Sequence, residues 1–181
     1  MSNKLIQIGK KYMINHIESI NIPYIDFDGF ENIGVLEVNK AVKEDVIKIF
    51  NDIKKIGFPI DKMDPIDKYN FSDRESVINN NTSSYNFRFV GNTLNLSDHS
   101  LGLAIDINPL QNPWVSPLAL NFSKYDPNKK GTIKKDSEIV KIFSNYGWSW
   151  GGNWKNPDYQ HFFIVNKEIK NDLMNYLSTF R

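Results

Sequence analysis

Apolar positions recur every three or four residues in three segments of the chain. This spacing predicts amphipathic helices, each with one face on a core. The segments are residues 39–56, 136–146 and 166–177. Gly57 and Pro59 end the first helix and Gly147 ends the second. Asn166 is placed to cap the third at its N-terminus.

Shorter apolar runs between these segments predict strands. They cover residues 85–90, 101–107 and 161–165. Two stretches rich in Asn, Asp, Ser and Pro, 61–84 and 111–135, are predicted to be loops, and loops of that length usually carry function or cover a site. Because helices and strands do not alternate regularly, the fold class is α+β. The 181 residues suffice for one domain, with a motif-bearing core over about 39–178 and residues 1–38 packed on it as an N-terminal extension.

The first unusual histidine, His99, precedes the predicted strand 101–107. Alternation along this strand points Leu101, Leu103, Ile105 and Ile107 toward the core. The opposite face carries Gly102, Ala104 and Asp106. Two small residues leave room beside the carboxylate for something bulky, and His99 enters from the same end.

The second unusual histidine, His161, begins the apolar run 161–165. Asp158 lies three residues before it, on a turn that follows Pro157. Upstream lies a Trp-Gly-Gly sequence at 150–152, with further tryptophans at 148 and 154. The tryptophans at 148, 150 and 154 fit a turn packed on a core as well as they fit a functional site.

Two imidazoles and one carboxylate, with a fourth position left to water, form the ligand set of catalytic zinc. His99, Asp106 and His161 supply those groups. Zinc makes water nucleophilic near neutral pH, and peptide hydrolysis then needs a general base, for which Asp158 is the candidate. A cation must also stabilise the oxyanion, and Arg88 is best placed by sequence.

Each of these residues alone has an ordinary explanation. A single histidine at a strand edge is usually hydrogen-bonded in a core, a single aspartate after an apolar run is usually a cap, and a single arginine is usually on the surface. The presence of all these residues in one chain favours a functional site. His16, in helical surroundings, is expected to be structural or exposed.

Composition excludes several other classes. The 22 basic and 21 acidic residues give a net charge of +1, which provides no long-range field for nucleic acid. The absence of cysteine excludes disulfides, thiolate metal sites and cysteine nucleophiles. The N-terminal segment has no apolar core of a signal peptide, and no stretch approaches the ~20 apolar residues of a membrane span. A soluble monomer is expected.

The motifs resemble those of the bacterial zinc D-alanyl-D-alanine carboxypeptidases and L-alanyl-D-glutamate endopeptidases, a family that includes several phage endolysins. Its first signature, Ser-x-His-x-x-Gly-x-Ala-x-Asp, is complete from Ser97 to Asp106. Its second, an acidic residue three before a histidine after a Trp-Gly-Gly turn, ends at Asp158 and His161. The motifs cover roughly residues 80–165.

The resemblance implies a small α+β domain with a central antiparallel sheet flanked by helices, and a zinc site at the sheet edge. It implies His99, Asp106 and His161 as zinc ligands, Asp158 as catalytic base, Arg88 as oxyanion stabiliser and Ser97 as a substrate-binding residue. Many members carry Glu at the place of Asp158, and the shorter arm of aspartate changes its reach. The implied substrates are peptidoglycan stem peptides, met either after secretion or after release from the cytoplasm, as phage endolysins are.

Three alternatives stay open. The sequence does not distinguish carboxypeptidase from endopeptidase activity, because the features that distinguish them lie in the two long loops. A mononuclear iron oxygenase also uses two histidines and a carboxylate, but usually places histidine and carboxylate two residues apart, whereas His99 and Asp106 are seven apart. A non-catalytic, zinc-stabilised wall-binding module is the third.

Overall fold

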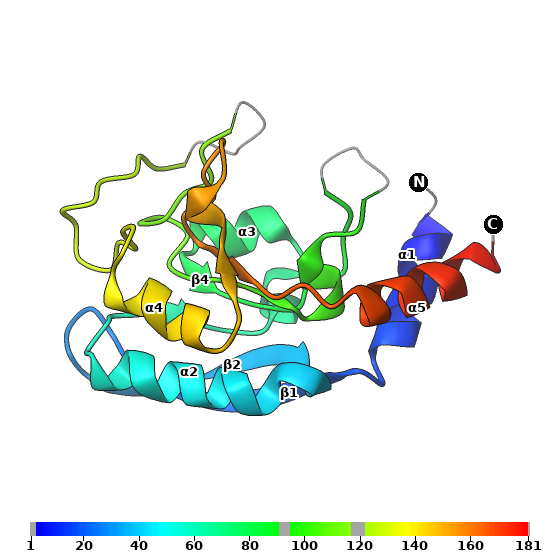
Figure 1. Ribbon diagram of the computed structural model, residues 1–181, viewed down its shortest axis with the longest axis horizontal. Coiled ribbons are helices and arrows are strands. Elements are labelled where there is room, and N and C mark those ends of the chain that lie inside the picture. Colours follow the sequence, from blue (N-terminus) through cyan, green and yellow to red (C-terminus); the bar gives the residue numbers. More distant parts are fainter. Residues whose placement is uncertain (1–2, 91–94, 117–121, 181) are drawn as a thin grey trace.

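The longest strands belong to a hairpin that the hydrophobic pattern did not predict. The computed structural model describes residues 3–90, 95–116 and 122–180. In it, β1 (Ile17–Ile25) pairs antiparallel with β2 (Glu31–Asn39), in a register that runs from Ile17 opposite Asn39 to Ile25 opposite Glu31. Its core face is covered by α2 (Lys43–Lys55), which carries the apolar stripe predicted for 39–56 (Figure 1).

The part of the chain that carries both sequence motifs is built on a small three-stranded sheet. Its order is β5 (Ala104–Asp106), β7 (His161–Phe163), β6 (Ser149–Trp150), all antiparallel. The helix α4 (Glu138–Asn145) packs beside it, and Phe143 stacks on Phe162 with ring centroids 3.8 Å apart. The sheet therefore has one face in the core.

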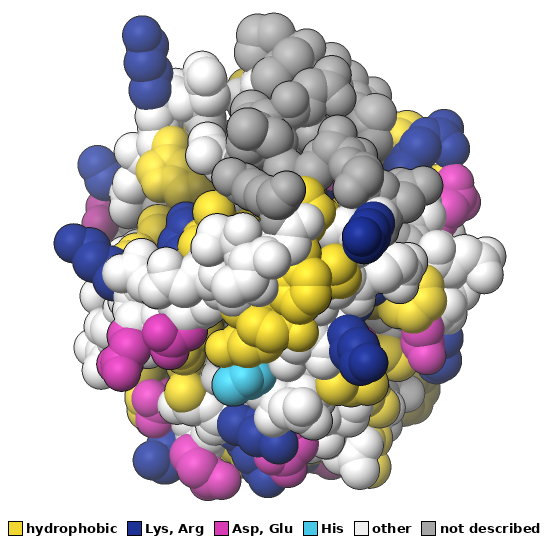
Figure 2. Space-filling view, turned by 90° about the vertical axis from the view of Figure 1, so that its right-hand side faces the viewer, with side chains coloured by type: hydrophobic (Ala, Val, Ile, Leu, Met, Phe, Trp, Pro, Cys, Tyr) yellow, Lys and Arg dark blue, Asp and Glu magenta, His cyan; other side chains and the backbone are white. Residues whose placement is uncertain are grey.

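Two short strands, a short helix and two terminal helices complete the described part of the fold. The strands β3 (Lys62–Met63) and β4 (Asn81–Thr82) pair in parallel, and α3 (Asp73–Ile78) lies between them in sequence. The helices α1 (Asn3–Met13) and α5 (Lys167–Ser178) lie side by side at one end, where the Tyr12 and Tyr176 rings are 4.5 Å apart (Figure 1). On that end, hydrophobic side chains gather among charged ones (Figure 2). Within the described part of the chain, no helix combines the length and apolar character that a membrane span requires.

Much of the predicted secondary structure is confirmed. All three predicted helices form, and Asn166 does cap α5 by accepting a hydrogen bond from the Ile169 amide. The strands predicted at 101–107 and 161–165 form, but each is only three residues long. The α+β class is confirmed, while the described strands form three small sheets and no single central sheet stands out among them.

Two predictions are wrong. Residues 85–90 form no strand ladder, because their backbone is bonded to several different segments: Tyr85 N to Glu37 O, Asn86 N to His99 O, and Arg88 N to the Ser100 hydroxyl. Residues 61–84 are not a plain loop, since they contain β3, α3, β4 and a 3₁₀ helix, Ile66–Tyr69. Residues 111–116 and 122–135 of the second predicted loop do lack helix and strand, apart from an isolated bridge at Trp114.

The predicted alternation along 101–107 is half right. All four aliphatic residues are buried, but residues 98–101 form a 3₁₀ helix rather than the start of a strand. Gly102 ends that helix with φ of +64°, and a Cβ there would lie 2.6 Å from the Asn39 backbone nitrogen. This glycine is therefore needed for a left-handed turn against β2, and not to leave room beside Asp106.

Candidate metal centre and active site

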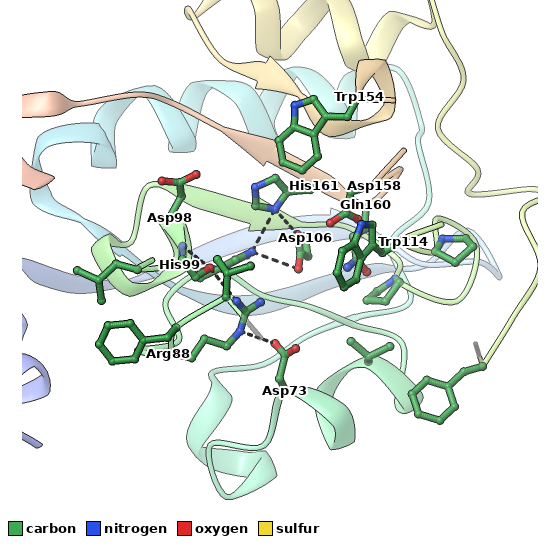
Figure 3. A pocket seen from close by; sticks show the side chains of 18 of the residues that line it. Asp73, Arg88, Asp98, His99, Asp106, Trp114, Trp154, Asp158, Gln160 and His161 are labelled. Carbon is green, nitrogen blue, oxygen red and sulfur yellow. Dashed lines mark hydrogen bonds and ion pairs between the residues drawn. The ribbon is translucent and has the colours of Figure 1, made fainter. Parts of the chain in front are cut away.

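Three side chains from two paired strands and one 3₁₀ helix converge on a single point. Asp106 at the end of β5 lies directly opposite His161 at the start of β7. His99, in the 3₁₀ helix Asp98–Leu101, reaches the same place (Figure 3). The His161 Nδ1 atom is 2.9 Å from Asp106 Oδ1, and the His99 Nε2 atom is 3.2 Å from both Asp106 Oδ2 and His161 Nδ1.

The Ser84 backbone orients the His99 ring. His99 Nδ1 lies 2.6 Å from the Ser84 carbonyl oxygen, which only accepts, so Nδ1 carries the proton and donates. In the neutral ring, Nε2 then presents a lone pair to a carboxylate oxygen and to a second imidazole. A cation among the three groups turns this repulsion into attraction, and a backbone carbonyl behind the ring is the usual support of a metal-bound histidine.

The three ligand atoms also have the spacing that a small cation requires. They all lie within 4.8 Å of one another, and their closest separations are 2.9 to 3.2 Å. Tetrahedral zinc with bonds of about 2.0–2.1 Å places neighbouring ligands ~3.3 Å apart. All three residues are buried. These residues therefore fit a zinc ion, and they are the ones that could hold it.

The charge state of Asp106 suits a ligand. Burial by itself would raise the pKa of this carboxyl, but the two neighbouring histidines outweigh burial and hold the pKa well below its usual range. Asp106 is therefore ionised at neutral pH, as a carboxylate ligand must be.

A tight turn places Asp158 beside the three residues. The amide of Asp158 donates to the Gly151 carbonyl over 3.1 Å, and the amide of His161 donates to the Asp158 carbonyl over 3.3 Å. A Cβ at Gly151 would lie 2.9 Å from that Asp158 oxygen and 3.3 Å from the His161 Cβ. Gly151, the first glycine of the Trp-Gly-Gly sequence, is therefore required because the turn that carries Asp158 packs directly on it.

Asp158 has the environment of a general base. Its Oδ1 atom is buried and has no hydrogen-bond partner within the described ranges, although the residue as a whole is half-buried. Burial first, and then repulsion from Asp106, raise the pKa of Asp158 to about 7, despite the opposing effects of His161 and Arg88. A group with a pKa near the working pH both accepts and returns a proton efficiently.

Arg88 enters the same cavity, held by two partners. Its Nε donates to Asp73 Oδ1 over 2.9 Å and its Nη1 donates to the Ser97 hydroxyl over 2.7 Å (Figure 3). Ser97 also begins the 3₁₀ helix of His99, whose amide donates to Ser97 Oγ over 3.4 Å. The hydroxyl of Ser97, predicted to bind substrate, is thus engaged with the guanidinium of Arg88.

These side chains line a cavity of about 440 Å³. Its walls include Trp114, Trp154, Leu96 and Phe122, while Asp98 and Lys170 add charge. The Trp154 ring centroid lies 5.4 Å from that of His161. Of the three tryptophans in the segment 148–154, Trp148 and Trp150 are buried in the core, whereas Trp154 is exposed and lines the cavity.

The structure brings together all six residues selected from the sequence: Arg88, Ser97, His99, Asp106, Asp158 and His161. Sequence analysis missed Asp73, Lys170 and Trp114, which lie in a predicted loop, a predicted helix and another loop. No motif marked these three residues. The one available signal for Trp114 was that it is an aromatic residue in a long predicted loop, and such loops often cover a site. His16 lies outside the cavity, is exposed, and stacks on Tyr12 with centroids 4.9 Å apart.

Comparison with known proteins gave a match to a sequence family. Residues 91–164 match the sequence family described as D-alanyl-D-alanine carboxypeptidase. Comparisons with curated proteins and with solved structures gave no match. The matched segment includes His99, Asp106, Asp158 and His161, and the match supports a peptidase. It confirms that this chain resembles the D-alanyl-D-alanine carboxypeptidase family, as the two motifs predicted.

Proposed function

We propose that this protein is a zinc-dependent peptidase that hydrolyses peptide bonds in the D-amino-acid-containing stem peptides of peptidoglycan. The observation that carries the proposal is the convergence of His99, Asp106 and His161 beside a buried carboxyl whose pKa is raised to about 7. The family match supports a metallopeptidase acting on peptidoglycan in general. The zinc ion, the roles of single residues and the stem-peptide bond are our inference.

The proposed roles follow from the chemistry of each group. His99, Asp106 and His161 would hold the metal. Bound zinc would supply a Lewis acid, which makes water nucleophilic near neutral pH and polarises a carbonyl. Asp158 lines the same cavity, and its Oδ1 atom has no hydrogen-bond partner among the described residues. In this proposal it accepts the proton of the attacking water and returns it to the leaving amine.

Arg88 is proposed to stabilise the negative charge that develops on the carbonyl oxygen. A fixed cation contributes most when it needs no reorganisation during the reaction. The Asp73 carboxylate and Ser97 hydroxyl hold the guanidinium from two sides, and so fix its orientation. In this proposal Ser97 acts on the substrate through Arg88.

The deciding experiment uses purified protein and muropeptides of defined stem length, with products read by mass spectrometry. Cleavage should stop with a zinc chelator and return with added zinc. Loss of a single terminal alanine would establish a D,D-carboxypeptidase, whereas release of the stem after its first alanine would establish an L-alanyl-D-glutamate endopeptidase. The Asp158→Ala variant is expected to bind zinc normally and to lose cleavage.

Two results would contradict the proposal. If zinc binds in a one-to-one ratio and no stem peptide is cut, the protein is a non-catalytic, zinc-stabilised module, and retained binding to cell walls would identify it as such. If Asp158→Ala retains full peptidase activity, the general base lies elsewhere.

A further inference from the structure

We propose that Lys170 binds a carboxylate of the peptide substrate, for which it leaves its weak ion pair with Asp98. The inference rests on the proposed peptidase function and adds to it a substrate class: stem peptides with a free carboxylate away from the bond that is cut. It assigns a specificity role to the C-terminal helix.

Lys170 reaches the cavity from an element that carries none of the other site residues. The helix α5 begins four residues after β7, and its first turns run past the cavity where Lys170 and Asp98 both line the wall. Asp98 immediately precedes His99 in the 3₁₀ helix. Lys170 lies beyond the family-matched residues 91–164, so the contact concerns a part of this chain that the match does not cover.

The two basic residues that line the cavity, among those described, differ in how firmly they are held. Arg88 is fixed by contacts of 2.9 Å and 2.7 Å. The Nζ of Lys170 is 4.0 Å from Asp98 Oδ1, and these side chains are 45% and 33% exposed. An ion pair so long and so exposed contributes little, and a lysine on its flexible stem exchanges partners readily. Lys170 is thus the cation free to move onto a ligand.

The charges nearby favour an anionic partner for this lysine. Asp98 alone would repel a carboxylate that enters beside His99, and Lys170 offsets that repulsion. When the ammonium group shifts to the substrate, the substrate carboxylate replaces Asp98 as its partner. Removal of the Asp98 charge should therefore strengthen binding of an acidic peptide, and removal of the Lys170 charge should weaken it.

The test uses a series of stem peptides in which each carboxylate in turn is replaced by its amide, with KM and kcat measured for each. For Lys170→Met, we expect KM to rise about 5-fold or more for the acidic peptide, with kcat little changed. For one amide in the series the same variant should have the wild-type KM, and that amide identifies the carboxylate that is bound. Lys170→Arg should restore most of the affinity, and Asp98→Asn should lower KM for the acidic peptide.

Lys167→Met is the matched control, because Lys167 is an exposed lysine at the start of the same helix and does not line the cavity. It should behave as wild type with every peptide. Equal effects of Lys170→Met on the acidic peptide and on all its amides would overturn the inference while leaving the peptidase intact. No cleavage by the wild-type protein would instead reject the proposed function itself.

Discussion

Two carboxyl groups that line the same cavity have pKa values shifted in opposite directions. The pKa of Asp106 is lowered by the two histidines, while the pKa of Asp158 is raised to about 7 by burial and by the charge of Asp106. Such a separation of pKa values suits the proposed roles of Asp106 as a metal ligand and Asp158 as a proton acceptor. The difference arises because His99 and His161 both contact Asp106, whereas the Asp158 Oδ1 atom has no hydrogen-bond partner in the described residues.

This separation predicts proton release on zinc binding. With a pKa of about 7, Asp158 is mostly protonated at pH 6 in the metal-free protein. A nearby divalent cation favours the ionised form, so zinc should expel that proton, and zinc affinity should rise as the pH rises from 6 toward 8. Calorimetric titration at pH 6, in buffers of different ionisation enthalpy, gives the number of protons released.

Asp158→Asn is the control for this measurement. It keeps the shape of the side chain and cannot titrate, so it should release fewer protons at pH 6 and show a flatter affinity profile. Identical release by both would show that Asp158 is already ionised without metal.

Arg88 gives a second prediction at this scale. Asp73→Asn removes the charge that holds the guanidinium Nε but leaves a side chain of the same size. If the fixed orientation of Arg88 stabilises the transition state, kcat should fall about 10-fold while KM changes little. Steady-state kinetics on the cleaved muropeptide would measure both constants.

A neighbouring ion pair provides the matched control. Glu75 lies on the same helix and pairs with Arg74 over 3.0 Å at an exposed position. Glu75→Gln should leave kcat, KM and thermal stability unchanged. Asp73→Glu, which restores the charge, should recover part of the activity; if it does not, the role of Asp73 is structural.

At the scale of elements, the sequence predicted the helices and motifs whose pattern is periodic or lies within a short segment. The helices were visible because their apolar stripes keep the helical spacing, and the His99–Asp106 and Asp158–His161 motifs lie close together in sequence. The hairpin β1–β2 was missed although its buried residues alternate, because exposed Ile33 and half-buried Ile17, Pro23 and Ile25 blur the pattern. The segment 85–90 was misjudged because its composition suits a strand, whereas its hydrogen bonds go to tertiary partners.

The same limit applies to the site. Asp73 and Lys170 meet Arg88 and Asp98 from helices 15 and 72 residues away along the chain (88 − 73 and 170 − 98). No pattern within a short segment of the sequence predicts such a contact. The Asp106–His161 pair is 55 residues apart but was predictable, because each partner lies in its own recognisable motif.

The long segment after β5 gives a prediction for stability. Asn112 is fully buried, and its side chain donates to the carbonyls of Ile107, Asn108 and Gly131 while accepting from the Ile133 amide. Asn112→Ala would leave several of these buried groups without partners, and should lower the free energy of unfolding by roughly 2–4 kcal/mol. Chemical denaturation measures this. Asn128→Ala, at an exposed position in the same segment, should change it little.

At the scale of the whole molecule, we propose that the chain forms one domain. The buried cluster is shared by residues from both ends of the sequence, including Ile22 and Leu36 of the hairpin, Phe143 of α4, Phe162 of β7 and Leu173 of α5. Both strands of the hairpin, within residues 17–39, contribute side chains to this cluster. The carbonyl of Gly102, at the end of the His99 helix, also accepts a hydrogen bond from the Asn39 amide over 3.0 Å. The N-terminal hairpin thus supports the backbone that carries His99, a proposed metal ligand.

This connection leads us to expect that zinc stabilises the entire fold. The three ligands come from elements joined through the core, so an ion that binds them only in the native state shifts unfolding by mass action. At free zinc about 1,000-fold above Kd, the gain is ~4 kcal/mol, or a rise in Tm of about 8–16 °C for a chain of this size. Thermal unfolding with chelator and with added zinc measures it. His99→Ala and His161→Ala should abolish the rise, whereas Asp158→Asn should retain it, since that residue is proposed to accept a proton and not to bind the metal. A Tm that zinc does not change in the wild-type protein would rule out the proposed ligand set.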